Sequence, residues 1–237
     1  MATDSMISEP ATAPLPVAPP PPPFLFPADW TLADLHAHLG GIPLERIRLY
    51  PPPGTATKRE MEAIRARTDR TCELIDGVLV EKVVGHYESM LAMLIGCRIG
   101  AYLESHDVGT ISGADSMMEL FPGHVRAPDV CVVRWERYPE GKVPDDPIPP
   151  VAPNLVVEVL SRSNTAAEMR RKLHDYFTAG VDLVWYIDPQ TRIARAFTGE
   201  EQFIELDEKG SLSGGEVLPG FELSLADVFN LRKARRG

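Results

Sequence analysis

This sequence of 237 residues has few cysteines and no lysine or arginine among its first 45 residues, and each shortage argues against a class of protein. The cysteines are Cys72, Cys97 and Cys131, and their wide spacing predicts neither a disulfide framework nor a Cys-x-x-Cys metal knuckle. No lysine or arginine precedes Arg46, so the sequence lacks the positively charged region of a secretory signal. No apolar run approaches the roughly 20 residues that cross a bilayer. We therefore expect a cytoplasmic protein with no membrane contact.

The overall charge is negative, with a net charge of -10 and a pI near 5.1. Because neutralising nucleic-acid phosphates requires clustered lysine and arginine, this balance argues against a general, high-affinity nucleic-acid binder. Any contact with DNA would have to be local. The sequence also has no glycine-rich phosphate loop, which disfavours the nucleotide-binding folds that depend on such a loop.

Proline divides the chain into regions. Residues 1–29 hold nine of the 23 prolines, so we expect a disordered proline-rich arm there. Residues 30–56 predict a short helix followed by an extended connector. The main domain is expected at residues 57–231, which is long enough to bury one substantial core. A basic tail follows at residues 232–237.

Within residues 57–231, β-rich and helical segments follow one another. Asp76-Gly77 between two β-rich runs is a strong hairpin signal. Thr165 and Glu168 form a capping box that opens a helix ended by Gly180. Strands are expected at residues 72–75, 78–83, 108–111, 116–121, 125–134, 154–160, 181–187, 192–197 and 202–206, and helices at 57–68, 86–105 and 165–179. This order predicts an α/β fold: a mixed β-sheet flanked by helices, with an extra β-hairpin and a C-terminal β-meander.

Two carboxylates stand in otherwise apolar strands. Glu158 interrupts the run at residues 154–160, and Asp129 opens the run at residues 130–133. Because burying an unpaired carboxylate costs several kcal/mol, Glu158 must lie at a strand edge, pair with a cation or bind a metal. Asp129 alone would be read as a turn residue. Together on neighbouring strands, the two side chains offer the hard oxygen ligands that suit Mg²⁺ or Mn²⁺.

Short motifs around these carboxylates resemble a known family. Pro128-Asp129 followed by Glu158-Val159-Leu160 resembles the PD-(D/E)XK nuclease signature. The wider series resembles the Uma-type restriction endonucleases over roughly residues 57–229; its further members are Cys72-Glu73-Leu74-Ile75-Asp76-Gly77, Lys172 with Tyr176, Ala179-Gly180-Val181 and Trp185-Tyr186-Ile187-Asp188-Pro189. The resemblance implies a restriction-endonuclease-like fold and metal-dependent hydrolysis of DNA. It assigns the metal to Asp129 and Glu158, with the carbonyl of Val159 as a further ligand.

One position departs from the signature. The third signature residue would be a lysine at position 160, and this chain has Leu160. Lys172, on the border of the helix that follows, is the natural substitute, and its alternative is an ordinary solvated lysine. Glu73 is the fourth member implied by the family pattern, as a second metal ligand or a proton acceptor. An exposed strand residue is the plain interpretation of Glu73.

Basic residues gather after Glu158 and in the tail, and they could hold DNA phosphates or form a solvated helix face; they are Arg162, Arg170, Arg171, Lys172, His174 and residues 232–236. By analogy with restriction enzymes, a homodimer is expected to cut both strands. The competing hypothesis is a catalytically inactive protein that keeps the fold as a DNA-binding or protein-interaction module, which Leu160 and the acidic pI favour. Cleavage of RNA is a third possibility with the same chemistry.

Overall fold

The computed structural model describes residues 24–68 and 70–230. The first 23 residues of the expected proline-rich arm and the whole basic tail at 232–237 lie outside these ranges. The last residues of that arm are placed against the domain, because the Phe24 N–H donates to the carbonyl of Gly54 at 2.9 Å. In the described part of the chain, no helix has the length and apolar character needed to cross a membrane.

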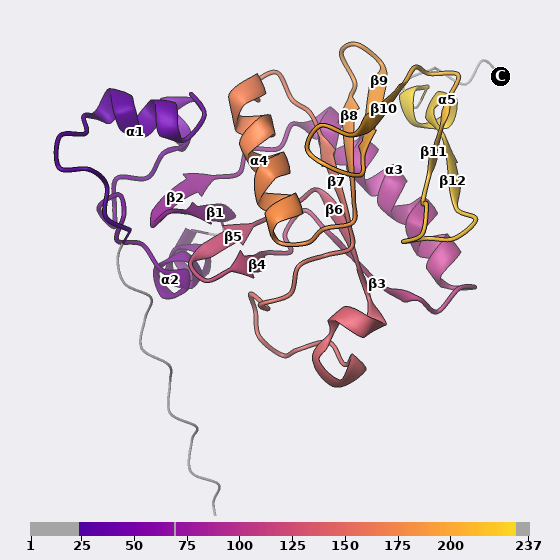
Figure 1. Ribbon diagram of the computed structural model, residues 1–237, viewed down its shortest axis with the longest axis horizontal. Coiled ribbons are helices and arrows are strands. Elements are labelled where there is room, and N and C mark those ends of the chain that lie inside the picture. The colour runs from indigo at the N-terminus through magenta and orange to yellow at the C-terminus, as the bar shows by residue number, and fades with distance from the viewer. Residues whose placement is uncertain (1–23, 69, 231–237) are drawn as a thin grey trace, which may run out of the picture.

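The described part of the chain has a large and a small β-sheet, a two-stranded ribbon, and helices between and beside them (Figure 1). The large sheet has the order β10-β9-β8-β7-β6-β3, with β3 at Gly109–Gly113, β6 at Val130–Arg134, β7 at Leu155–Val159, β8 at Leu183–Asp188, β9 at Ile193–Phe197 and β10 at Phe203–Leu206. The small sheet has the order β2-β1-β5-β4, with β1 at Cys72–Ile75, β2 at Val78–Glu81, β4 at Met118–Phe121 and β5 at His124–Arg126. Within the large sheet, β7 and β8 pair in parallel and the other described neighbours pair antiparallel, so this sheet is mixed, as predicted.

Helices surround these sheets. They are α1 at Leu32–His38, α2 at Lys58–Thr68, α3 at His86–Leu103, α4 at Ala166–Thr178 and α5 at Leu225–Phe229, with short 3₁₀ turns at Leu44–Arg46, Trp135–Arg137 and Pro139–Gly141. A short ribbon of β11 (Ser211–Ser213) and β12 (Glu222–Ser224) precedes α5. The expected C-terminal meander corresponds to β8, β9 and β10, whereas the β11–β12–α5 unit was not predicted.

The hairpin of β1 and β2 forms as predicted at Asp76-Gly77. Both residues have positive φ, at 49° and 70°, which is the backbone of the two-residue turn that joins twisted antiparallel strands. The turn sets the register at Ile75 opposite Val78 and Glu73 opposite Val80. Glu73 is thereby fixed on a strand of the small sheet and is buried rather than exposed.

The strand predicted at residues 125–134 is wrong as a single element. It divides into β5 of the small sheet and β6 of the large sheet, with Ala127-Pro128-Asp129 between them. Pro128 has no N–H group to donate to a strand ladder, so a continuous central strand cannot pass through it. The chain therefore changes sheets at this point, and Asp129 lies where the two sheets meet.

Helix α4 lies between the two sheets (Figure 1). Its apolar residues Met169, Leu173 and Tyr176 pack against the large sheet, whose opposite face packs against α3 and α5. The other side of α4 is polar and contacts the small sheet and α1, for example through the ion pair of Arg171 with Asp76. The predicted cap is present, because the Thr165 side chain accepts a hydrogen bond from Glu168 N–H.

Gly109 provides a test of how tightly β3 is packed against β6. A Cβ atom there would lie 2.2 Å from the carbonyl oxygen of Val133, which is backbone and cannot move aside, whereas a Cβ atom on Gly113 of the same strand would meet nothing within 4 Å. We expect Gly109→Ala to lower the free energy of unfolding by about 2 kcal/mol or more, as overpacking does. Urea unfolding measures the loss, with Gly113→Ala as the matched control; equal stability of the two variants would contradict the register of β3.

Candidate functional site

Asp129, directly before β6, lies opposite Glu158 of the neighbouring strand β7. The antiparallel register pairs Val130 with Val157, and the Asp129 N–H donates to the carbonyl of Val157 at 3.1 Å. The Val159 N–H in turn donates to Asp129 Oδ2 at 2.8 Å. Both carboxylates are buried. The two strands are therefore neighbours, as predicted, and their backbones fix the position of both acids.

Lys172 and Tyr176, one turn apart on α4, reach Glu158 from the side of the small sheet. The Lys172 ammonium is 3.0 Å from Glu158 Oε1, and the Tyr176 hydroxyl donates to the same oxygen. Lys172 is also 3.0 Å from Glu73 Oε1. Lys172 is buried, so it is not the solvated lysine of the alternative interpretation. Leu160, at the position of the missing signature lysine, packs against the apolar core beneath α4.

Glu73 continues the network into the small sheet. Its Oε2 accepts from Arg126 Nη1 at 2.7 Å, and Arg126 Nε donates to Asp175 Oδ2 at 3.0 Å. His124 Nε2 lies 3.0 Å from that same oxygen of Asp175. All of these side chains are buried. Because an isolated buried charge is costly, the alternation of acids and bases is what allows each of them to lie between the sheets.

Lys82 is a member of the site that the sequence analysis missed. Its ammonium is 2.8 Å from Asp129 Oδ1 and 2.7 Å from the carbonyl oxygen of Ala127. The side chain is 8% exposed. The sequence did hold a signal for Lys82, which follows strand β2 and precedes two valines. A lysine in such an apolar stretch is seldom buried unless it has a partner of opposite charge.

The pKa values of the carboxyl groups diverge within this network. Burial raises the pKa of Glu158, the nearby charge of Asp129 raises it further, and Lys172 opposes both effects. Burial alone would also raise the pKa of Glu73, but Lys172 and Arg126 outweigh burial and hold this pKa well below its usual range. Glu73 is therefore an ionised partner of two cations, whereas Glu158 is the acid whose charge is poorly compensated.

The carboxylate oxygens of Asp129 and Glu158 are the type of ligand that hard divalent cations prefer. Lys172 and Tyr176 both bind Glu158 Oε1, and among the described residues no hydrogen bond reaches Oε2. Asp129 Oδ1 contacts the Lys82 ammonium, which is carried on a long and flexible side chain. Neither residues 24–68 nor residues 70–230 contain a group of three or more His, Cys, Asp or Glu side chains placed to hold a metal. A metal here would use two carboxylates, with main-chain oxygen and water completing its shell.

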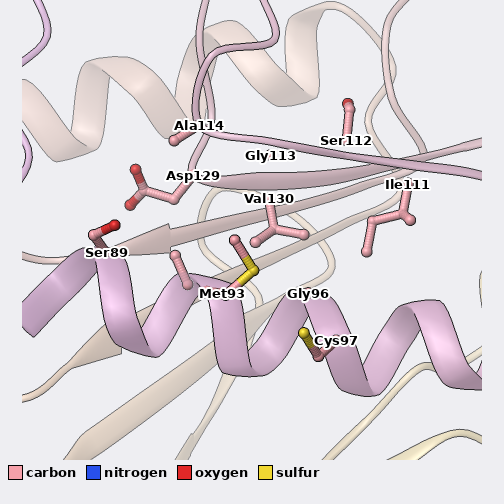
Figure 2. Close-up of a pocket in the computed structure, with 11 residues that line it drawn as sticks. Ser89, Met93, Gly96, Cys97, Ile111, Ser112, Gly113, Ala114, Asp129 and Val130 are labelled. Atoms are coloured by element: carbon pink, nitrogen blue, oxygen red, sulfur yellow. The ribbon is translucent and has the colours of Figure 1, made fainter.

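A pocket of about 320 Å³ opens beside Asp129. It lies between α3 and the edge of the large sheet, and Figure 2 shows the Asp129 carboxylate toward the same end as the Ser89 side chain. Met93 and Cys97 of α3 form part of its wall. Glu73, Glu158 and Lys172 are buried and do not line this pocket, so Asp129 is the acid of the site that borders it.

The basic cluster expected after Glu158 does not form one positive surface. Lys172 is buried, Arg171 pairs with Asp76 and His174 lies 3.0 Å from Glu200. Arg162 and Arg170 are exposed and line a separate hollow at the start of α4. Local positive charge for a polyanion is therefore limited to these two arginines in this part of the chain.

Comparison with known proteins supports the nuclease-like fold. A family model named Uma2, with the description "Putative restriction endonuclease", matches residues 59–226. Among solved structures, a putative nuclease belonging to DUF820 from Anabaena variabilis is similar with a TM-score of 0.61 and 18% identity, covering 69% of this chain and 92% of that chain. At this identity the likeness shows the fold, which confirms the predicted restriction-endonuclease-like sheet. No curated protein matches the chain.

Lys172 is expected to carry much of the stability of the site. Lys172→Met leaves Glu73 and Glu158 without their shared cation, so we expect the free energy of unfolding at pH 7 to fall by about 3–5 kcal/mol. Adding Glu158→Gln to Lys172→Met should recover part of the loss. Urea unfolding measures both effects, with exposed Lys142→Met as a control that stays within about 0.5 kcal/mol. A stable Lys172→Met protein would contradict the network.

Asp175 is expected to make the protein sensitive to acid. Burial opposes ionisation of Asp175, but the hydrogen bond from His124 and the charge of Arg126 lower its pKa from 3.8 to about 2. A carboxyl group whose pKa is lower in the folded than in the unfolded state stabilises the fold at pH values above its unfolded pKa. This contribution, about 2 kcal/mol, is lost as the pH falls from about 4 to 2. Unfolding free energies across that window should fall less steeply for Asp175→Asn than for the control Asp182→Asn, a half-exposed partner of Arg137. Parallel slopes would rule out the effect.

Proposed function

Since the chain belongs to the Uma2 family of putative restriction endonucleases, we propose that it is a nuclease that hydrolyses phosphodiester bonds of DNA with Mg²⁺ or Mn²⁺. The observation that carries the proposal is the pair of buried carboxylates, Asp129 and Glu158, set opposite each other by an antiparallel register beside a pocket. Two neighbouring carboxylates repel each other, and a divalent cation bound by both would relieve that repulsion.

Asp129 and Glu158 would hold the ion, with the carbonyl of Val159 as a further ligand. When bound, a divalent ion polarises the scissile phosphate and lowers the pKa of an attacking water. Tyr176 and Lys172 fix Glu158 through Oε1, which leaves Oε2 for the ligand role. The main-chain N–H of Val159 fixes Asp129 through Oδ2 in the same manner.

Lys172 and Glu73 support the reaction in this scheme. Burial raises the pKa of Glu158, and the charge of Lys172 opposes this shift, which favours the ionised form that a metal ligand requires. Glu73 holds the Lys172 ammonium from the other side and is the auxiliary carboxylate. DNA would approach through the pocket at Asp129, and a homodimer would bring two such sites to the two strands.

A catalytically inactive protein that keeps the fold for DNA or protein binding is the second candidate. The observation that favours it is the pairing of both candidate metal ligands with lysines of the chain itself, Asp129 with Lys82 and Glu158 with Lys172. Such internal pairs satisfy the acids without any metal. Titration calorimetry with Mn²⁺ separates the two candidates, because a binding-only protein has no use for a metal at these residues.

The proposed reaction is tested by removing one charge at a time. Asp129→Asn and Glu158→Gln keep the shape of each side chain, and we expect either to abolish Mn²⁺ binding and to slow nicking of supercoiled plasmid by at least about a hundredfold. Glu205→Gln, on the outer strand β10 with an exposed pair to Arg195, is the matched control and should cleave normally. Supercoiled, linear and single-stranded DNA, together with RNA, are the substrates. Normal cleavage by the Asp129 or Glu158 variant would refute the assignment.

A further inference from the structure

The ammonium of Lys82 lies among oxygen atoms at the edge of the candidate site. It is 2.8 Å from Asp129 Oδ1, 2.7 Å from the carbonyl oxygen of Ala127 and 3.3 Å from that of Ala114. One carboxylate oxygen and two main-chain carbonyl oxygens are also ligands that hard divalent cations prefer. A divalent ion at Asp129 would therefore compete with this ammonium for the same oxygens.

Lys172 is not free to move in the same way. Its ammonium is 3.0 Å from both Glu73 and Glu158, so its departure would leave two buried carboxylates without their shared cation. Among residues 24–68 and 70–230, the Lys82 ammonium pairs with one carboxylate, and Asp129 keeps the hydrogen bond from Val159 N–H at Oδ2 when Lys82 leaves. Of the two lysines, Lys82 can leave its carboxylate at the lower cost.

Lys82 also lies next to solvent-accessible hollows. It lines one hollow together with Arg70, Thr71 and Ala114. Ala114 and Asp129 line the neighbouring pocket beside α3, where both are labelled in Figure 2. A lysine has a flexible four-carbon stem, so rotation of the side chain can turn the ammonium from Asp129 toward these hollows.

We propose that Lys82 holds the cation position at Asp129 in the metal-free protein and yields it to a divalent ion, after which its ammonium faces a phosphate of the nucleic acid. This inference rests on the proposed function. It assigns the substrate-facing cation, absent at Leu160, to Lys82, and it leaves Lys172 as a positioning residue for Glu158. Each negative group has a positive partner after this exchange, because the ion replaces the ammonium at Asp129 and the ammonium offsets the charge of the phosphate.

The displacement can be measured on the wild-type protein without any cleavage. Amine acylation followed by mass spectrometry reports how accessible each lysine is, with and without saturating Mn²⁺. We expect acylation of Lys82 to rise at least about threefold with Mn²⁺, because the ammonium leaves a contact in which its side chain is 8% exposed. Lys58 is the internal control, since it contacts Glu119, Asp146 and the carbonyl of Ile148 in a similar oxygen set; its acylation should not change.

A variant tests the same exchange through affinity. Lys82→Gln removes the competing charge but keeps a donor for Asp129, so Mn²⁺ should bind about tenfold more tightly by calorimetry. Cleavage by the same variant should be at least about tenfold slower, because the phosphate-facing cation is gone. Opposite changes in affinity and rate distinguish this role from a merely structural one, which would weaken both. Lys58→Gln should leave both unchanged, and Lys82→Arg should restore part of the rate.

The outcomes separate this inference from the proposed function. Unchanged acylation of Lys82 at saturating Mn²⁺, or weaker Mn²⁺ binding by folded Lys82→Gln, overturns the inference even if the wild type cleaves DNA. A wild type that binds Mn²⁺ and exposes Lys82 but cleaves no nucleic acid refutes the nuclease while the exchange of cations stands. Absence of Mn²⁺ binding in both wild type and Lys82→Gln overturns the exchange. If Lys82→Gln does not fold, the acylation experiment alone decides.

Discussion

The structure depends on a buried network of paired acids and bases between its two sheets. Lys82 pairs with Asp129, and beside them a second series runs from Glu158 through Lys172, Glu73, Arg126 and Asp175 to His124. Each acid is acceptable in the interior only because a base lies within hydrogen-bond distance, and each base is held in turn by the next acid. The small sheet is thus fixed to α4 and the large sheet by polar contacts whose geometry is demanding.

The place of α4 follows from this network and from its two-sided sequence. Met169, Leu173 and Tyr176 bury the helix against the large sheet, while Lys172 and Asp175 on its other side meet the small sheet. The cation that contacts Glu158 therefore comes from this helix, as Lys172. Leu160 can be apolar because the space at that position belongs to the core.

The buried network that stabilises the fold also contains the candidate metal ligands. Glu158 is the acid whose pKa burial and Asp129 raise, and Glu73 is the acid whose pKa Lys172 and Arg126 hold low. Carboxylates with such different environments in one network are typical of functional sites, although ion-pair networks also produce them. In addition to these charges, a pocket opens at Asp129, at one end of the network.

Local signals determined a large part of the fold. Asp76-Gly77 fixed the hairpin and Thr165 the start of α4, because turn and cap geometry depend on adjacent residues. The acids Asp129 and Glu158 were also evident from the sequence, because each stands beside or within a run of apolar residues. Only the tertiary structure decided that Arg126 pairs with Glu73 and that Lys82 reaches Asp129. These depend on contacts between residues more than 40 positions apart, and the pattern of one segment does not specify which distant charge will compensate it.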